Sequence, residues 1–175
     1  MSYIILGLLF ILSGFFMKYS DDLFDVNDNL AFASVFGVFC GIASALASVY
    51  SIEAAYIFIA ILIGNLFVLK VDGMHHLIAL IVFFLILLVG GIPDLNLVIL
   101  LICILGIVSD EVGHELISDF TQNRFANLFF EYRFVMKIVV LLLALCGVFN
   151  IWIFVCFILF EISYVAAGIL FENIN

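Results

Sequence analysis

Long apolar runs separated by short polar breaks make up most of this 175-residue sequence. A bilayer core about 30 Å thick needs roughly 20 apolar residues per helix, and the alternating ten-residue pattern of a membrane barrel is absent from the sequence. The runs therefore predict an all-α, polytopic transmembrane helical bundle that forms a single domain over residues 1–175. We expect about seven spans, at 3–17, 30–50, 54–69, 77–92, 95–108, 131–149 and 151–171.

Two interpretations of the C-terminal region stay open. Between residues 138 and 160 the apolar run is interrupted only by Gly147 and Asn150. Residues 138–171 therefore form either two spans or one long span followed by an interfacial helix, because the whole stretch is too long for a single crossing.

A short internal similarity suggests a repeat. The segments "SDDLFD" at 20–25 and "SDEVGH" at 109–114 each follow one apolar run and precede two more. This order gives a possible 3+1+3 arrangement of helices, in which the two repeats run in parallel, as in some membrane folds.

Composition and charge agree with a membrane location. The sequence is 68% hydrophobic and only 11% charged, with a mean hydropathy of +1.44, which is far outside the range of soluble domains. The first run has no basic residue before it and no small-residue cleavage site after it, so we expect it to be retained as a helix. The net charge of −9 excludes nucleic acid as a partner, because phosphate backbones require a basic surface.

Charged residues gather on one side when the seven spans are threaded through a membrane. All five basic residues fall on that side, at Lys18, Lys70, Arg124, Arg133 and Lys137. By the positive-inside rule this side is cytoplasmic, and the N-terminus faces outward from the cell membrane. Only Glu53 and Asp94 among the charged residues fall on the opposite side.

Two acidic clusters lie on the predicted cytoplasmic side. If the helix continues past residue 20, Asp21, Asp25 and Asp28 recur on a single face, and the second cluster contains Glu111, His114, Glu115 and Asp119. Carboxylates held together repel, so a cation is expected between them. Mg²⁺ takes oxygen ligands and bridges carboxylates to phosphates, so two facing clusters suit a diphosphate held through metal. The alternative is that the acidic residues belong to solvated loops.

Three further polar features have no assigned role. The segment "KVDGMHH" at 70–76 contains Asp72, His75 and His76, which have donor types that suit a transition metal or an interfacial cap. Glu111 and His114 have the i, i+3 spacing of di-iron bundles, but no second Glu-x-x-His occurs. Glu161 lies within the last apolar run, so we expect it to face the bundle interior and to pair with a donor or carry function.

The order of these features resembles the UbiA superfamily of intramembrane prenyltransferases, in which four helices separate two Asp-rich cytoplasmic segments. Here "SDDLFDVND" and "SDEVGHELISD" occupy those places. The resemblance implies Lys18 and Arg124 near the diphosphate, an isoprenoid tail among the helices, and catalytic roles for Asp21, Asp25 and Asp110. It also implies Mg²⁺ bound by Asp21, Asp22, Asp25 and Asp28 and by Asp110, Glu111 and Asp119.

A second resemblance covers less of the chain. "SDDLFD" followed by "VDGMHH" is similar to the paired Asp motifs of polyprenyl-phosphate sugar-1-phosphate transferases, which are also Mg²⁺-dependent enzymes of the cytoplasmic face.

The sequence therefore predicts a membrane-embedded, Mg²⁺-dependent transferase that acts on an isoprenoid phosphate or diphosphate and a lipid-soluble acceptor, among membrane lipids. Two alternatives stay open. One is a divalent cation transporter or channel, in which the acidic cluster concentrates cations. The other is a non-catalytic membrane subunit whose acidic loops bind a basic partner.

Overall fold

The computed structural model describes residues 3–71, 73–120 and 124–174, without the side chains of 116–120 and 126. These residues form eight α-helices: α1 (Tyr3–Asp25), α2 (Leu30–Tyr50), α3 (Ile52–Phe67), α4 (Met74–Gly90), α5 (Leu97–Phe120), α6 (Arg124–Glu131), α7 (Phe134–Leu145) and α8 (Ile151–Ile174). Four of them, α1, α2, α5 and α8, are long and apolar enough to cross a membrane, and α3, α4 and α7 are shorter apolar helices. The predicted all-α class is confirmed, and the long apolar helices support an integral membrane protein.

Helix boundaries differ from the predicted spans where polar residues continue a helix. The first helix extends into the first acidic cluster and ends at Asp25, so Asp28 lies beyond it, and α5 continues well past residue 108. An additional short helix, α6, precedes α7. Residues 138–171 form two helices, because Gly147 adopts a left-handed backbone (φ +73°) in the turn between α7 and α8.

Asparagine and serine residues in the polar breaks begin several helices. The Asn29 side chain accepts a hydrogen bond from the Phe32 amide at the start of α2, and Ser51 accepts one from the Ala54 amide at the start of α3. The side chain of Asn150 accepts a hydrogen bond from the Trp152 amide at the start of α8. Each cap satisfies an amide that the helix itself leaves without a partner.

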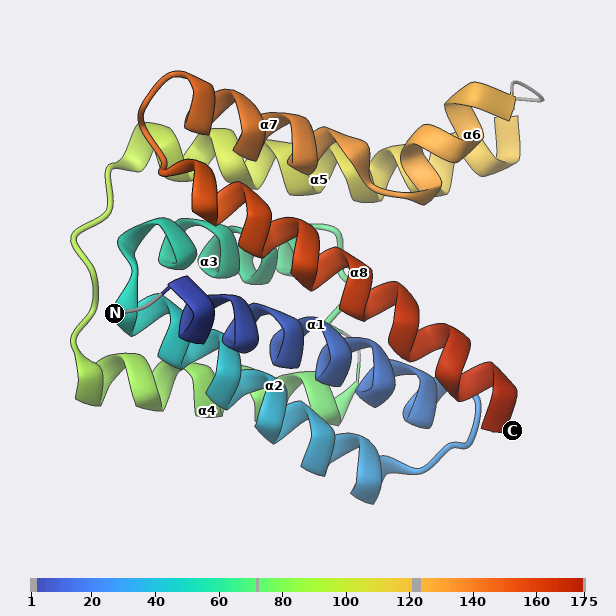
Figure 1. Cartoon of the computed structure of the whole chain (residues 1–175). Helices are drawn as coiled ribbons and strands as arrows, with labels where there is room; N and C mark the ends of the chain where they lie inside the picture. Colours follow the sequence, from blue (N-terminus) through green and yellow to red (C-terminus); the bar gives the residue numbers. More distant parts are fainter. Residues whose placement is uncertain (1–2, 72, 121–123, 175) are drawn as a thin grey trace.

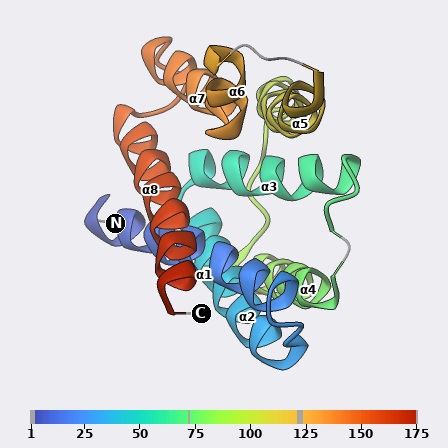
Figure 2. The same cartoon turned by 90° about the vertical axis from the view of Figure 1, so that its right-hand side faces the viewer.

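The long helices form two groups joined by two bridging helices. In the first group α2 packs against α1 and α4, and in the second group α5 packs against α7. Helix α3 contacts both α2 and α5, and α8 contacts both α1 and α7, so each of them bridges the groups. Figure 2 shows the groups one above the other, with α3 and α8 between them.

The packing pairs follow the order expected for the predicted repeat. When α1, α2 and α3 are matched with α5, α7 and α8, the pairs α1–α2, α2–α3 and α3–α5 correspond to α5–α7, α7–α8 and α8–α1, and all six pairs are in contact. Helix α4 lies outside this circuit, against α2. The repeat itself stays a prediction.

The connections lie at two ends of the bundle, as the threading of seven spans predicts. Figure 1 shows the α1–α2 and α3–α4 connections and the ends of α5 and α8 at one end, whereas the start of α1 and the α4–α5 and α7–α8 connections lie at the other. Both acidic clusters therefore lie at the same end, which we call the acidic end. Its cytoplasmic orientation stays a prediction.

Close approach of backbones holds α1 against α8. A Cβ atom added at Gly14 of α1 would lie 2.3 Å from the Phe160 carbonyl oxygen of α8, whereas one added at Gly7 would lie no closer than 3.6 Å to any neighbouring atom. Small residues allow such approach, and in membrane bundles this packing replaces the hydrophobic driving force.

Replacing Gly14 with alanine should therefore destabilise the fold by about 1–3 kcal/mol, because α1 and α8 must separate to accommodate the methyl group. Gly7→Ala on the same helix is the matched control and should leave stability equal or slightly higher, because alanine favours helix over glycine. Thermal unfolding in nanodiscs measures both. Equal effects of the two variants would contradict this account of the α1–α8 contact.

Candidate functional site

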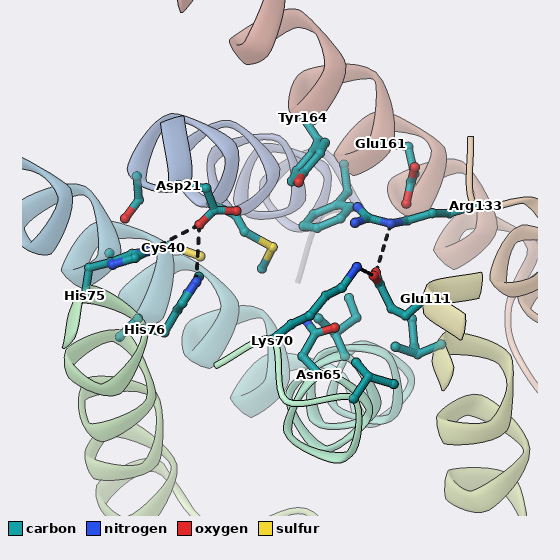
Figure 3. Close-up of a pocket in the computed structure, with 18 of the residues that line it drawn as sticks. Asp21, Cys40, Asn65, Lys70, His75, His76, Glu111, Arg133, Glu161 and Tyr164 are labelled. Atoms are coloured by element: carbon teal, nitrogen blue, oxygen red, sulfur yellow. Dashed lines mark hydrogen bonds and ion pairs between the residues drawn. The ribbon is translucent and has the colours of Figure 1, made fainter. Parts of the chain in front are cut away.

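A polar cavity of about 520 Å³ opens within the acidic end of the bundle. Its walls come from α1, α2, α3, α4, α5 and α8 and from Arg133 between α6 and α7. Its floor is apolar and includes Ile61, Phe157 and Phe160. Charged and polar side chains from segments far apart in the sequence point into this space (Figure 3).

One wall holds a cluster of three metal-ligating side chains. Asp21 of α1 lies beside His75 and His76 of α4, and ligand atoms of the three residues all lie within 4.8 Å of one another. The Nε2 atoms of His75 and His76 lie 3.7 and 3.8 Å from Asp21 Oδ1. Ligand atoms of a tetrahedral zinc ion, bound at about 2.0–2.1 Å, lie roughly 3.3–3.5 Å apart, so small side-chain movements would complete such a site.

His75 is buried without a hydrogen-bond partner. The residue is 2% exposed, and neither ring nitrogen forms a hydrogen bond. Its ring packs against Phe24 with centroids 4.6 Å apart. A Cβ atom added at Gly73 would lie 2.3 Å from the His75 ring, so glycine at the start of α4 makes room for the imidazole. Buried polar groups normally have a hydrogen-bond partner or bind a metal ion. The two unpartnered ring nitrogens of His75 therefore suit an ion bound in the cavity.

The facing wall holds two cations around one buried carboxylate. Glu111 of α5 is 4% exposed, and its oxygens lie 2.5 Å from Lys70 Nζ and 2.9 Å from Arg133 Nε. Lys70 also lies 3.5 Å from a carboxylate oxygen of Glu115, one helical turn further along α5. Figure 3 shows the Asp21–His75–His76 cluster on one side and Lys70, Glu111 and Arg133 on the other.

Aromatic and acidic groups of α8 complete the cationic wall. Arg133 lies over the Tyr164 ring, 5.5 Å from its centroid. Burial lowers the pKa of the Arg133 guanidinium, but nearby Tyr164 and Glu111 raise the pKa by more, so the group stays charged. Glu161 faces the bundle interior as predicted, and its partner is Lys137 of α7 at 2.8 Å.

The two predicted acidic clusters do meet in this cavity. Asp21 and Asp25 of the first cluster and Glu111 and Glu115 of the second all line it. Other predicted site residues lie elsewhere among the residues described: Asp22 pairs with Lys18 at 2.8 Å, His114 and Arg124 are exposed outside the cavity, and Asp28 is exposed in the turn after α1 with φ +51°. The side chain of Asp119, and all of Asp72, lie outside the described residues.

Asp110 has a structural position. It is 1% exposed, and its two carboxylate oxygens accept hydrogen bonds from the amides of Val135 and Met136, at 2.9 and 2.7 Å. These amides belong to the first turn of α7, where a negative charge is favoured. The geometry of Asp110 therefore fits a cap that joins α5 to α7 better than the catalytic and metal-binding roles predicted from sequence.

The donor set differs from the predicted magnesium site, whose ligands are carboxylates together with His114. Imidazole nitrogen suits zinc, iron, copper and nickel, whereas Mg²⁺ prefers oxygen and retains several waters. Two histidines and one aspartate leave at least one coordination position for water or a substrate oxygen. The buried, unpaired His75 ring fits such an ion.

From the sequence alone, His75 and His76 group with Asp72, which lies outside the described residues, and Lys70 and Arg133 have no place in the site. The structure places the two histidines beside Asp21, from which they are separated in the chain by two helices. A detectable signal was present, because Lys70, His75 and His76 flank one connection at the acidic end.

Comparison with protein-family models, curated proteins and solved structures found no match to this chain. The resemblance to the UbiA superfamily therefore stays a hypothesis based on the order of the motifs.

Replacing Asp110 with alanine should lower stability by about 1–2 kcal/mol, because two amides of α7 lose their acceptor. Metal affinity should stay unchanged, because Asp110 does not line the cavity. Thermal unfolding in nanodiscs and Mn²⁺ titration measure the two quantities. The control is Glu172→Ala, an exposed acidic residue near the end of α8, which should change neither. If Asp110→Ala instead weakens metal binding strongly while the fold keeps its full stability, Asp110 is a metal ligand rather than a helix cap.

Proposed function

We propose that this protein is a membrane-embedded, metal-dependent enzyme that acts on a lipid carrying a phosphate or diphosphate group. One observation carries the proposal: the Asp21–His75–His76 cluster faces Lys70 and Arg133 across a single cavity. Lys70 and Arg133 offset the buried Glu111 carboxylate and also line the cavity, so an anion that enters it meets both of them. A metal ion and two basic side chains together suit a substrate with several negative charges.

The two basic side chains supply complementary anion contacts. Arg133 presents a planar guanidinium that can bind two phosphate oxygens, whereas Lys70 presents a compact point charge. Both already contact Glu111, so an entering phosphate would share donors with that carboxylate. The site is thus preorganised, because its cations are held in the cavity before the substrate arrives.

A bound metal ion would act as a Lewis acid on a phosphate oxygen. In the transferase form of the proposal, the bond between the lipid carbon and the phosphate oxygen breaks, and its electron pair leaves on the phosphate group. Lys70 and Arg133 stabilise that charge. The lipid carbon then bonds to the acceptor, whose proton passes to a cavity carboxylate. The apolar floor limits water around the reacting carbon.

The metal we propose is a transition metal such as Zn²⁺ or Fe²⁺ rather than Mg²⁺, because two of the three donors are imidazoles, and Mn²⁺, the weakest binder of the first-row divalent ions, serves as the probe ion in the titrations. The proposal therefore replaces the Mg²⁺ expected from the sequence with a transition metal, but it keeps the expected substrate class, a lipid phosphate or diphosphate. An isoprenoid chain and a lipid-soluble acceptor remain the specific form of the proposal that follows from the UbiA resemblance.

Divalent cation transport fits the described core less well. A transport path needs polar groups beyond the cavity floor. Between the floor and the opposite end, the hydroxyls of Ser44 and Ser48 donate to carbonyls of their own helix, and the surrounding core contains Phe10, Ile57 and Phe58.

The metal site can be tested directly by Mn²⁺ titration of the purified protein. His75→Ala should reduce Mn²⁺ affinity by about tenfold or more, because one of three protein ligands is lost. Gly73→Ala keeps all three ligands but displaces the His75 ring, and should also weaken binding. His114→Ala is the matched control, because His114 is exposed outside the cavity. Equal affinity in the His75 and His114 variants would refute the cluster as a metal site.

The anion-binding role of Arg133 predicts a separate effect. Arg133→Ala should raise the KM for an isoprenyl diphosphate by about tenfold or more while Mn²⁺ affinity stays unchanged, because the residue belongs to the facing wall. Arg124→Ala is the control, since Arg124 is exposed outside the cavity. Turnover of the isoprenyl diphosphate by the wild-type protein is measured before the two variants are compared. If metal binds, and is carried across liposomes without any turnover, transport replaces the enzyme proposal.

A further inference from the structure

We infer that one hydrocarbon chain of the substrate occupies an apolar groove between α2, α3 and α4. The groove continues from the metal-binding wall of the cavity. The inference rests on the proposed function for the chemistry of the head group, and it specifies the tail: a single alkyl or isoprenyl chain that lies beside α4.

The groove is small, apolar and continuous with the cavity. Its volume is about 100 Å³, and it is lined mainly by apolar residues, among them Phe58, Leu62, Leu80 and Phe83. His76, Asn65 and Ala79 line both the groove and the polar cavity, so the two spaces meet beside the metal ligands. A chain attached to a head group in the cavity therefore has a direct route into the groove.

Packing explains why this space exists. Helix α2 packs against both α3 and α4, but α3 and α4 make little direct contact along their described lengths. Their separation is visible in Figure 2, where α3 crosses above α4. The groove is the space between them, and Gly41 and Ser44 of α2 line one side of it.

The direction of the groove suits a lipid tail. On α3 it extends from Asn65 back to Phe58, and on α4 from His76 to Phe83, which in each case is seven residues or about 10 Å along the helix. Both directions lead from the acidic end toward the middle of the bundle, as a tail anchored by its head group requires. The small volume limits the occupant to one chain.

The groove borders the helix surface that a bilayer would cover. Leu62 and Leu80 are partly exposed, and the neighbouring Ile81 is 54% exposed. A chain can therefore enter sideways from the lipid without crossing the polar cavity. Apolar contacts then hold the chain, and the metal and the cationic wall hold the head group.

Photolabelling in nanodiscs tests the inference. The probe is a single-chain alkyl phosphate with a diazirine in its tail, applied to the Mn²⁺-loaded protein, and labelled residues are mapped by mass spectrometry. We expect labelling of residues 58–62 and 79–83, reduced by competing unlabelled alkyl phosphate. An alkanol with the same diazirine chain but no phosphate is the matched probe. Equal labelling by both probes would mean that ordinary bilayer chains fill the groove, and the inference would fail.

Two substitutions at adjacent positions sharpen the test. Leu80→Trp fills the groove and should reduce phosphate-dependent labelling by about tenfold, whereas Ile81→Trp, which lies outside it, should leave labelling unchanged. Leu62→Trp provides a second blocking variant on α3 if Leu80→Trp folds poorly. Unchanged labelling in a folded blocking variant would overturn the inference.

Metal titration of the same samples separates this inference from the proposed function. If Mn²⁺ binds but labelling is not localised, the tail site is wrong and the proposed metal centre stands. If Mn²⁺ does not bind, the proposed function fails, and the tail inference fails with it because it depends on that head-group site.

Discussion

Compensation of the buried Glu111 carboxylate organises the acidic end of the bundle. A buried charge without a partner costs several kcal/mol, so Glu111 requires the cations that contact it, Lys70 and Arg133. Lys70 comes from the α3–α4 connection and Arg133 from the α6–α7 connection, and neither is near Glu111 in sequence. This one carboxylate therefore fixes two connections against α5 and keeps two positive charges inside a membrane protein cavity.

The same arrangement divides the cavity into two walls with different chemistry. Imidazole nitrogens and the Asp21 carboxylate offer metal-ligating atoms on one wall, and the other wall offers hydrogen-bond donors with positive charge. A ligand that satisfies both walls must accept hydrogen bonds and also coordinate a metal, which phosphate oxygens do. The apolar floor and the adjoining groove extend this match to a molecule with a hydrocarbon part.

Much of the fold follows from the sequence, but the site depends on helical phase. The all-α class, the long apolar helices and the placement of both acidic clusters at one end of the bundle follow from hydropathy and threading. The sequence does not show which of two adjacent acidic residues faces the cavity. Asp21 faces it, whereas Asp22 pairs with Lys18. Likewise Glu111 faces it, whereas Asp110 caps α7. Adjacent positions on a helix differ by about 100° in direction, and tertiary packing decides which one points inward. For the same reason the pairing of His75 with Asp21 required the packing of both α1 and α4 against α2.

The place of α4 outside the helix circuit has a consequence for biogenesis. Asp21, His75 and His76 all precede the end of α4, whereas Glu111 and Arg133 follow it. A nascent chain that has been translated only to Gly90 therefore already carries every residue of the three-ligand cluster, and α4 can dock on α2 without any later helix. If the cluster binds a metal as proposed, the ion can therefore be captured during membrane insertion, before synthesis of the second half of the protein completes the cavity.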